Sequence, residues 1–139
     1  MKMVKIGCIA SLMLLSNASF AQISVSEIKR QPIEKIERVE NCSVKADIDR
    51  HSIPSTPNNV ALPVYGQQII GWGKGPEEVL LKTQTLHLSD IESYQQKGVT
   101  LPMLQQWADF YDNETQRNSC NPTAPLRAEL MKKIMKMWM

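Results

Sequence analysis

The chain has 139 residues, of which 16 are basic and 14 acidic, so its formal net charge is +2. Lys2 and Lys5 account for this surplus, and both lie in a segment with the features of an export signal. The rest of the chain is neutral and has no block of like charges, which argues against nucleic-acid binding. Its length suffices for one domain with a modest core.

Residues 1–21 have the three parts of a signal peptide. Two lysines form a positively charged start, residues 6–15 are apolar, and residues 19–21 (Ser-Phe-Ala) place small side chains at the −3 and −1 positions of a cleavage site. The apolar stretch is too short to cross about 30 Å of hydrocarbon, so we expect no transmembrane anchor after processing. We therefore predict a periplasmic or secreted protein, with lipid attachment at Cys8 as the weaker alternative.

Two cysteines, Cys42 and Cys120, follow the leader. In an oxidising compartment an even pair favours a disulfide, which would stabilise so long a loop by about 4 kcal/mol in the chain-entropy model. Two buried, unbridged thiols are the alternative. Asp47, Asp49 and His51 would share one strand face but have no further ligand nearby, so we predict no metal site and no cofactor.

Residues 22–70 are interpreted as an N-terminal extension, partly extended or flexible, ahead of a helical domain at residues 71–139. A short helix is expected at residues 32–40, where apolar residues recur every three positions. Strict alternation at residues 42–49 predicts a half-buried strand. A second extended stretch is expected at residues 60–70. Because this stretch contains Pro63, it would have to be a strand at the edge of a sheet. Two strands alone are marginally stable, so such a pair must lie against the helices.

The overall prediction is a mainly α fold, with a compact cluster of about four short helices after the extension. The first begins at Pro76, with two acids in the turn that follows, where the helix dipole favours them. A capping box at residues 89–92 begins the second, and Gly98 is placed to end it. The central helix spans residues 100–118 and the last about 126–138. Their short connections imply helices packed against their chain neighbours.

A glycine cluster at residues 71–75 precedes the first helix. Its backbone N–H groups suit an anion, but the spacing matches neither the phosphate loop nor the dinucleotide fingerprint. Glu77 and Glu78 would also repel a phosphate at that helix start. We therefore favour a tight turn that folds Trp72 back onto the helices.

The central helix has an apolar face and an acidic face. The expected core residues are Leu101, Leu104, Ala108 and Tyr111, with Trp107 at the margin of the core. Asp109 and Asp112 lie on the other side. A solvated face explains them better than acid–base catalysis, which needs two carboxylates in separate environments.

The last helix combines four basic residues with several methionines. Contact with a membrane surface or a partner groove is a weak alternative for this helix. We favour the simpler interpretation, in which the cations suit the helix C-terminus and the apolar stripe belongs to the core.

Four motifs stand out from residue 71 onward. They are Gly-Trp-Gly-x-Gly-Pro-Glu at 71–77, Gly-Val-Thr at 98–100, Trp-x-Asp-Phe-Tyr-x-Asn-Glu-x-x-Arg-Asn at 107–118 and Asn-Pro-Thr-Ala at 121–124. Together, over residues 71–138, they resemble a small helical domain of unknown function in bacterial proteins. Ser119-Cys120 stands where the pattern has Pro-Gly, which fits a cysteine recruited for a bridge. The resemblance implies a shared fold and a bacterial source, and it transfers no catalytic residue.

We interpret the chain as a secreted, non-enzymatic binding or inhibitor-type protein of the cell envelope with a protein or cell-wall partner, because it is small, neutral and without catalytic motifs. The candidate binding residues are Trp72, Lys74, Trp107, Asp109, Arg117 and Asn121. The alternative hypothesis is an envelope-acting hydrolase or toxin-like effector that uses Glu78 and Asp109 on peptidoglycan. A cleft holding these two carboxyls about 5–9.5 Å apart would support it.

Overall fold

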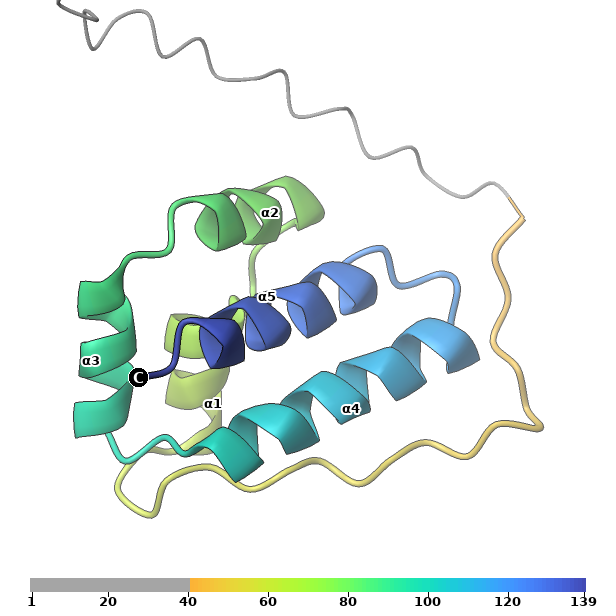
Figure 1. Ribbon diagram of the computed structural model, residues 1–139. Coiled ribbons are helices and arrows are strands. Elements are labelled where there is room, and N and C mark those ends of the chain that lie inside the picture. Colours follow the sequence, from red (N-terminus) through yellow and green to blue (C-terminus); the bar gives the residue numbers. More distant parts are fainter. Residues whose placement is uncertain (1–40) are drawn as a thin grey trace, which may run out of the picture. The chain divides into compact units, whose positions relative to one another are not determined.

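The computed structural model describes residues 41–139, which are mainly helical (Figure 1). The elements are α1 (Leu62–Tyr65), the π-helical turn η2 (Gly66–Ile70), α2 (Pro76–Gln84), α3 (Leu88–Gln96), α4 (Leu101–Arg117) and α5 (Ala124–Lys136). The predicted fold class is confirmed, and α2 to α5 are the four expected helices. The predicted signal peptide and the predicted helix at residues 32–40 lie outside the described residues.

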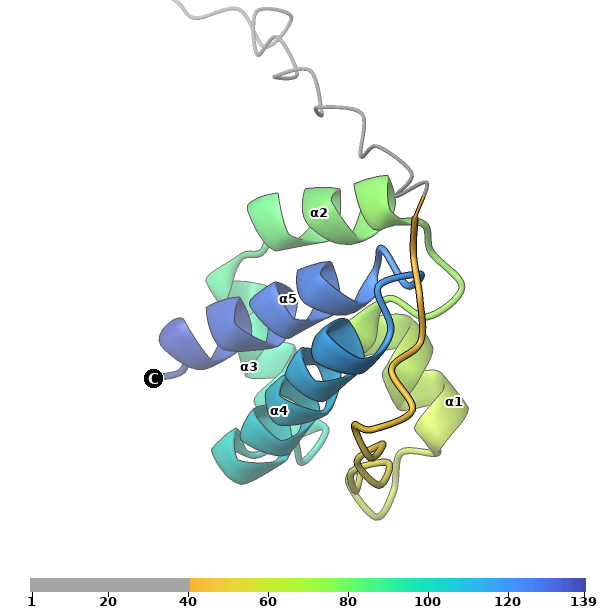
Figure 2. The same ribbon diagram turned by 90° about the vertical axis from the view of Figure 1, so that its right-hand side faces the viewer.

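α4 and α5 form an antiparallel hairpin around which the other helices pack (Figures 1 and 2). α2 lies against the side of α5 that faces away from α4. α3 lies near the end of the chain, where the side-chain amide of Gln95 donates to the carbonyl of Met139 at 3.2 Å. The hairpin therefore provides the frame on which the earlier parts of the chain are placed.

Local capping explains where the helices begin and end. The Thr100 hydroxyl accepts the Met103 N–H at 3.4 Å and starts α4 as predicted. Gly98, at a φ of 83°, follows the end of α3, also as predicted. The predicted capping box is wrong in register, because the Asp90 carboxylate accepts the His87 N–H at 2.8 Å and α3 begins before Ser89.

The two predicted extended stretches are wrong. Residues 42–49 make one isolated bridge, Val44 to Asn118. Val44 stays 56% exposed, because no second strand within residues 41–139 covers the alternating apolar side chains. Residues 60–70 are α1 and η2. Pro63 falls in the first turn of a helix, where it is tolerated, rather than at a sheet edge. At helical spacing Tyr65 and Ile69 become fully buried, so this part of the expected extension belongs to the core.

The predicted disulfide is confirmed between Cys42 and Cys120. It fixes the start of a strap, residues 42–55, that runs along α4 (Figure 1). Beside the disulfide, the Lys45 N–H donates to the Arg117 carbonyl at 2.7 Å and the Ser119 N–H to the Ser43 carbonyl at 3.1 Å. The strap is therefore anchored to the C-terminal end of α4 by covalent and backbone bonds together.

Two buried side chains of α4 hold the rest of the strap. The amide of Asn113 accepts the His51 N–H at 2.9 Å and donates to the Asp49 carbonyl at 3.0 Å. The indole of Trp107 donates to the Ser55 carbonyl at 3.1 Å. These bonds satisfy backbone groups of a segment that has no regular secondary structure of its own.

Trp107 is the centre of the core, not its margin. Its side chain is fully buried, and its ring centroid lies within 6.1 Å of those of Tyr65, Trp72, Phe110 and Tyr111. The buried stripe of α4 runs through residues 104, 107, 108 and 111, the i, i+3, i+4, i+7 pattern of an amphipathic helix. Leu101 lies one turn before this stripe and is 43% exposed, which corrects its expected place in the core.

Candidate functional site

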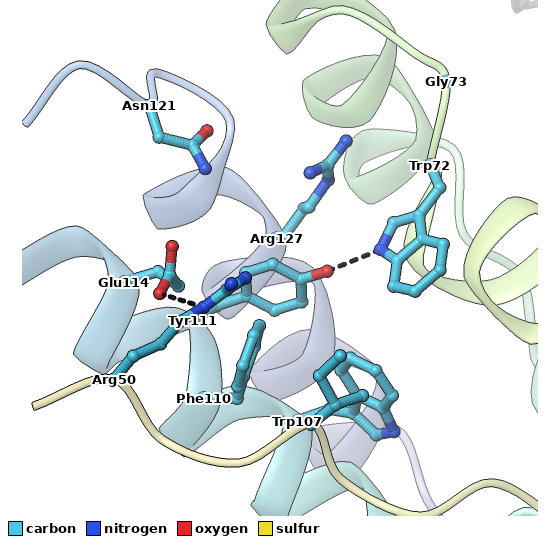
Figure 3. A pocket seen from close by; sticks show the side chains of 10 residues that line it. Arg50, Trp72, Gly73, Trp107, Phe110, Tyr111, Glu114, Asn121 and Arg127 are labelled. Atoms are coloured by element: carbon cyan, nitrogen blue, oxygen red, sulfur yellow. Dashed lines mark hydrogen bonds and ion pairs between the residues drawn. The ribbon is translucent and has the colours of Figure 1, made fainter. Parts of the chain in front are cut away.

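A pocket of about 320 Å³ opens between the strap, the turn after η2, α4 and the start of α5 (Figure 3). Its lining residues are Arg50, Ile53, Trp72, Gly73, Trp107, Phe110, Tyr111, Glu114, Asn121 and Arg127. Most are aromatic or charged, and they come from four segments of the chain, residues 50–53, 72–73, 107–114 and 121–127. The volume is at the small end of the range of ligand sites, so it suits one small ligand group.

Trp72 forms one wall of the pocket. The turn that carries it needs positive φ at Gly71 (85°) and Gly73 (77°), which glycine adopts without strain. The indole N–H donates to the Tyr111 hydroxyl at 2.6 Å, and the ring packs directly on Gly66. The glycine cluster thus forms the predicted tight turn that folds Trp72 onto the helices.

Glu114 is the pocket's buried carboxylate, with 4% of its surface exposed. It accepts hydrogen bonds from Arg50 Nε at 3.0 Å and from Arg117 Nη2 at 3.0 Å. Arg117 Nε donates to the same oxygen at 3.1 Å. Two guanidinium groups therefore compensate the one negative charge that lines the pocket.

Arg127 is the pocket's other cation, and within residues 41–139 it forms no ion pair. Its guanidinium carbon lies 5.8 Å from the centroid of the Tyr111 ring, a cation–π contact. One terminal nitrogen reaches the Gly71 carbonyl at 3.4 Å, and Nε is buried without an acceptor. Burial raises the pKa of Tyr111, although Trp72 and Arg127 oppose the shift, so its hydroxyl stays protonated.

The family model described as "Domain of unknown function (DUF4951)" matches residues 40–138. The chain belongs to this family. The match confirms the resemblance seen in the motifs, and it begins at the strap rather than at residue 71. The structure titled "NMR structure of the protein from Acinetobacter baumannii" is 43% identical to this chain, covers 69% of it and 90% of its own length, and superposes with a TM-score of 0.57. No curated protein matches this DUF4951 chain.

The DUF4951 structure places the six predicted binding residues in different surroundings. Three of them line the pocket: Trp72, Trp107 and Asn121. Trp107 supports the pocket from the core, because none of its surface is exposed. Arg117 lies behind the pocket and acts on it through Glu114. Lys74 lines a separate hollow beside α2, and Asp109 lines another beside the strap.

The residue pattern alone missed the three charged residues that line the pocket of the DUF4951 domain: Arg50, Glu114 and Arg127. A local signal existed for Glu114, which stands three residues before Arg117 on one helix face. A signal also existed for Arg127, because a cation near a helix N-terminus opposes the helix dipole. No local signal placed Arg50, which reaches Glu114 across 64 positions.

The two carboxylates of the hydrolase hypothesis line hollows that share no residue. Glu78 accepts the Gly75 N–H at 3.3 Å and so helps to start α2. Asp109 accepts a hydrogen bond from the Gln105 side chain at 2.9 Å. Each carboxylate therefore has a local structural partner, Glu78 at the residue that precedes α2 and Asp109 on α4 itself.

Among residues 41–139, no three His, Cys, Asp or Glu side chains gather in a way that would hold a metal ion. In the same part of the chain, no helix combines the length and apolar character needed to cross a bilayer. The apolar side of α5 packs in the core through Ala128, Met131 and Ile134, as favoured above.

Proposed function

We propose that this DUF4951 domain is a secreted, non-enzymatic binding protein of the cell envelope, and that the pocket between Trp72 and Arg127 is its recognition site. The observation that carries the proposal is the pocket itself, in which aromatic rings and guanidinium groups surround a space open to a small ligand group. The disulfide supports export, because such bonds persist mainly in oxidising compartments.

The chemistry of the lining residues favours binding over catalysis. General acid–base catalysis needs a group that can exchange a proton with the ligand near neutral pH. Glu114 is engaged by two arginines, and burial raises the pKa of Tyr111 away from neutrality. Arginine remains protonated throughout. The pocket therefore offers orientation and charge, and no side chain in it is free to act as a general base.

The size of the pocket limits the kind of partner group that can enter it. A volume of about 320 Å³ accommodates a protruding group, not a broad protein surface. A cell-wall fragment offers such a group, and so does a protein partner that inserts a side chain or a chain end, as an inhibitor-type contact would. The hydrolase hypothesis has no comparable observation in its favour, because Glu78 and Asp109 line separate hollows.

The test compares retention of the exported protein by isolated cell walls and by immobilised envelope proteins. We expect wild type to be retained by one of them, and Trp72→Ala to lose retention because a pocket wall is removed. Leu88→Ala, an exposed position on α3 outside the pocket, is the control and should bind normally.

Three results would contradict the proposal. They are no retention of wild type on either material, equal retention of Trp72→Ala when circular dichroism shows it to be folded, and a cytoplasmic chain that still begins at Met1. Digestion of cell walls by wild type but not by Glu78→Gln would replace binding with hydrolysis.

A further inference from the structure

We infer that the pocket selects an oxyanion, a carboxylate or phosphate carried on a small apolar or planar body, and that Arg127 is the residue that binds it. The inference rests on the proposed function and specifies the class of ligand.

Charge is the first argument. Glu114 is the one carboxylate among the residues that line the pocket, and it is already paired with Arg50 and Arg117. Farther along α5, Lys132 is paired with Asp112 at 3.1 Å and with Glu129 at 3.2 Å. Arg127 is thus a half-buried guanidinium whose charge no described ion pair balances. A ligand that supplies a negative charge would balance it.

Unused hydrogen-bond donors are the second argument. A guanidinium group has five N–H donors. In Arg127, among residues 41–139, one terminal nitrogen makes a long bond to the Gly71 carbonyl and the group also interacts with the Tyr111 hydroxyl, which leaves most of its donors without an acceptor. Its Nε is buried with no acceptor at all, a state that folded proteins rarely leave uncompensated. Because Nε is buried, a ligand in the pocket would meet the terminal nitrogens, and an oxyanion can accept two N–H groups from arginine there.

Asn121 adds donors of the same kind. Its side-chain oxygen accepts the Thr123 N–H and the Ala124 N–H, both at 3.2 Å, and caps α5. With the oxygen directed at the helix, the amide nitrogen remains a donor at the pocket, across from Arg127 in Figure 3. Asn121 and Arg127 therefore both present N–H groups to the same space.

The position of Arg127 on α5 is the third argument. It is the fourth residue of the helix, near the end where the helix dipole is positive. A cation there is disfavoured in the empty domain, whereas an anion bound beside it interacts favourably with both the dipole and the guanidinium. The partly exposed indole of Trp72 and the edge of Phe110 offer apolar contact for the remainder of the ligand.

The first experiment uses the unaltered domain and three small probes: benzoate, phenyl phosphate and the neutral benzamide. NMR titration follows the indole N–H of Trp72 and the Nε–H of Arg127. We expect at least one anion to bind at least about tenfold more tightly than benzamide, because a charge-assisted pair is roughly twice as strong as a neutral one. The preferred anion identifies the source as a carboxylate or a phosphate. Equal affinities for benzamide and both anions would overturn the inference.

The second experiment tests Arg127 itself. Arg127→Gln should weaken the preferred anion by about tenfold or more, while Lys133→Gln, an exposed cation on the same helix, should leave affinity unchanged. The anion should also raise the thermal midpoint of wild type and not that of Arg127→Gln. Unchanged affinity in a folded Arg127→Gln domain would overturn the assignment. If that variant does not fold, the comparison of probes on wild type still decides.

The inference and the proposed function can fail separately. Retention on envelope material that Trp72→Ala abolishes, combined with equal affinity for benzoate, phenyl phosphate and benzamide, would reject the oxyanion and keep the binding function. Selective anion binding without retention on envelope material would keep the oxyanion site and reject the binding function.

Discussion

Replacing Gly66 with alanine tests whether Trp72 is packed as closely as the structure shows. Gly66 has an ordinary helical φ of −58°, so its conformation does not require glycine. A Cβ at this position would lie 2.8 Å or less from three carbons of the Trp72 ring. Glycine is therefore needed here for close approach, and the indole must retreat before any side chain fits.

The expected loss of stability follows from the contacts that the retreat would break. In an unobstructed helix, glycine to alanine stabilises by about 0.5–1 kcal/mol. Two effects oppose this gain. Overpacking costs about 1–3 kcal/mol. Loss of the hydrogen bond from Trp72 to Tyr111 costs about 1 kcal/mol. The edge contact with the Trp107 ring adds about 0.5–1.5 kcal/mol. We expect Gly66→Ala to lower the free energy of unfolding by about 2–4 kcal/mol.

Urea unfolding measures this loss, and the indole N–H resonance of Trp72 reports whether the ring has moved. Gly73→Ala is the matched control. Its φ of 77° disfavours alanine by about 1–2 kcal/mol, but no atom lies within 4 Å of the added carbon. It should therefore lose less stability. A Gly66→Ala protein that is as stable as wild type and has an unchanged indole resonance would show that Trp72 does not pack closely on Gly66.

Three further predictions concern the buried charge, alkaline stability and the disulfide. Glu114→Gln should lower the free energy of unfolding, measured in urea, by about 2–3 kcal/mol. Most of this loss comes from the ion pair with Arg117, because Arg50 is 57% exposed and its pair is screened by solvent. The loss should therefore be smaller when Glu114→Gln is made in an Arg117→Met protein. Burial raises the pKa of Tyr94 to about 12, so the folded state holds a proton that the unfolded state loses above about pH 10. Stability should fall by at most about 2–3 kcal/mol between pH 10 and 12, and Tyr94→Phe should flatten this fall; an identical pH profile would contradict the assignment. Cys42→Ser should lower the free energy of unfolding by about 4 kcal/mol in the chain-entropy model. An oxidised wild-type protein whose urea midpoint stays the same when reductant is added would contradict this prediction.

Local signals predicted the helices well, because each signal acts within one turn. Thr100 caps α4 through its own hydroxyl, and Gly98 ends α3 through its own backbone angle. The errors lie where a pattern needs a partner elsewhere in the chain. Alternation at residues 42–49 indicates a strand only if a second strand exists, and Pro63 breaks a strand or begins a helix depending on what its neighbours bury.

The site was harder to predict than the fold for the same reason. Trp72, Trp107 and Asn121 were found, and each stands in one of the motifs that the sequence shows, Gly-Trp-Gly, Trp-x-Asp-Phe-Tyr and Asn-Pro. The contact of Arg50 with Glu114 joins positions 64 apart and depends on the path of the strap. Likewise, Trp107 was predicted at the margin of the core and lies at its centre. The residues of α4 that are buried depend on what packs against the helix, which the helix sequence does not specify.

The pocket draws its walls from both ends of the described chain, with Arg50 in the strap and Arg127 on the final helix. Residues 72–127 supply eight of the ten lining residues, and the strap adds Arg50 and Ile53. The site is completed only when residue 120 is available to lock residue 42 in place and the last helix has docked. The pocket proposed for recognition is therefore complete only in a chain that holds both the strap and the last helix, and a chain still emerging before residue 127 lacks it.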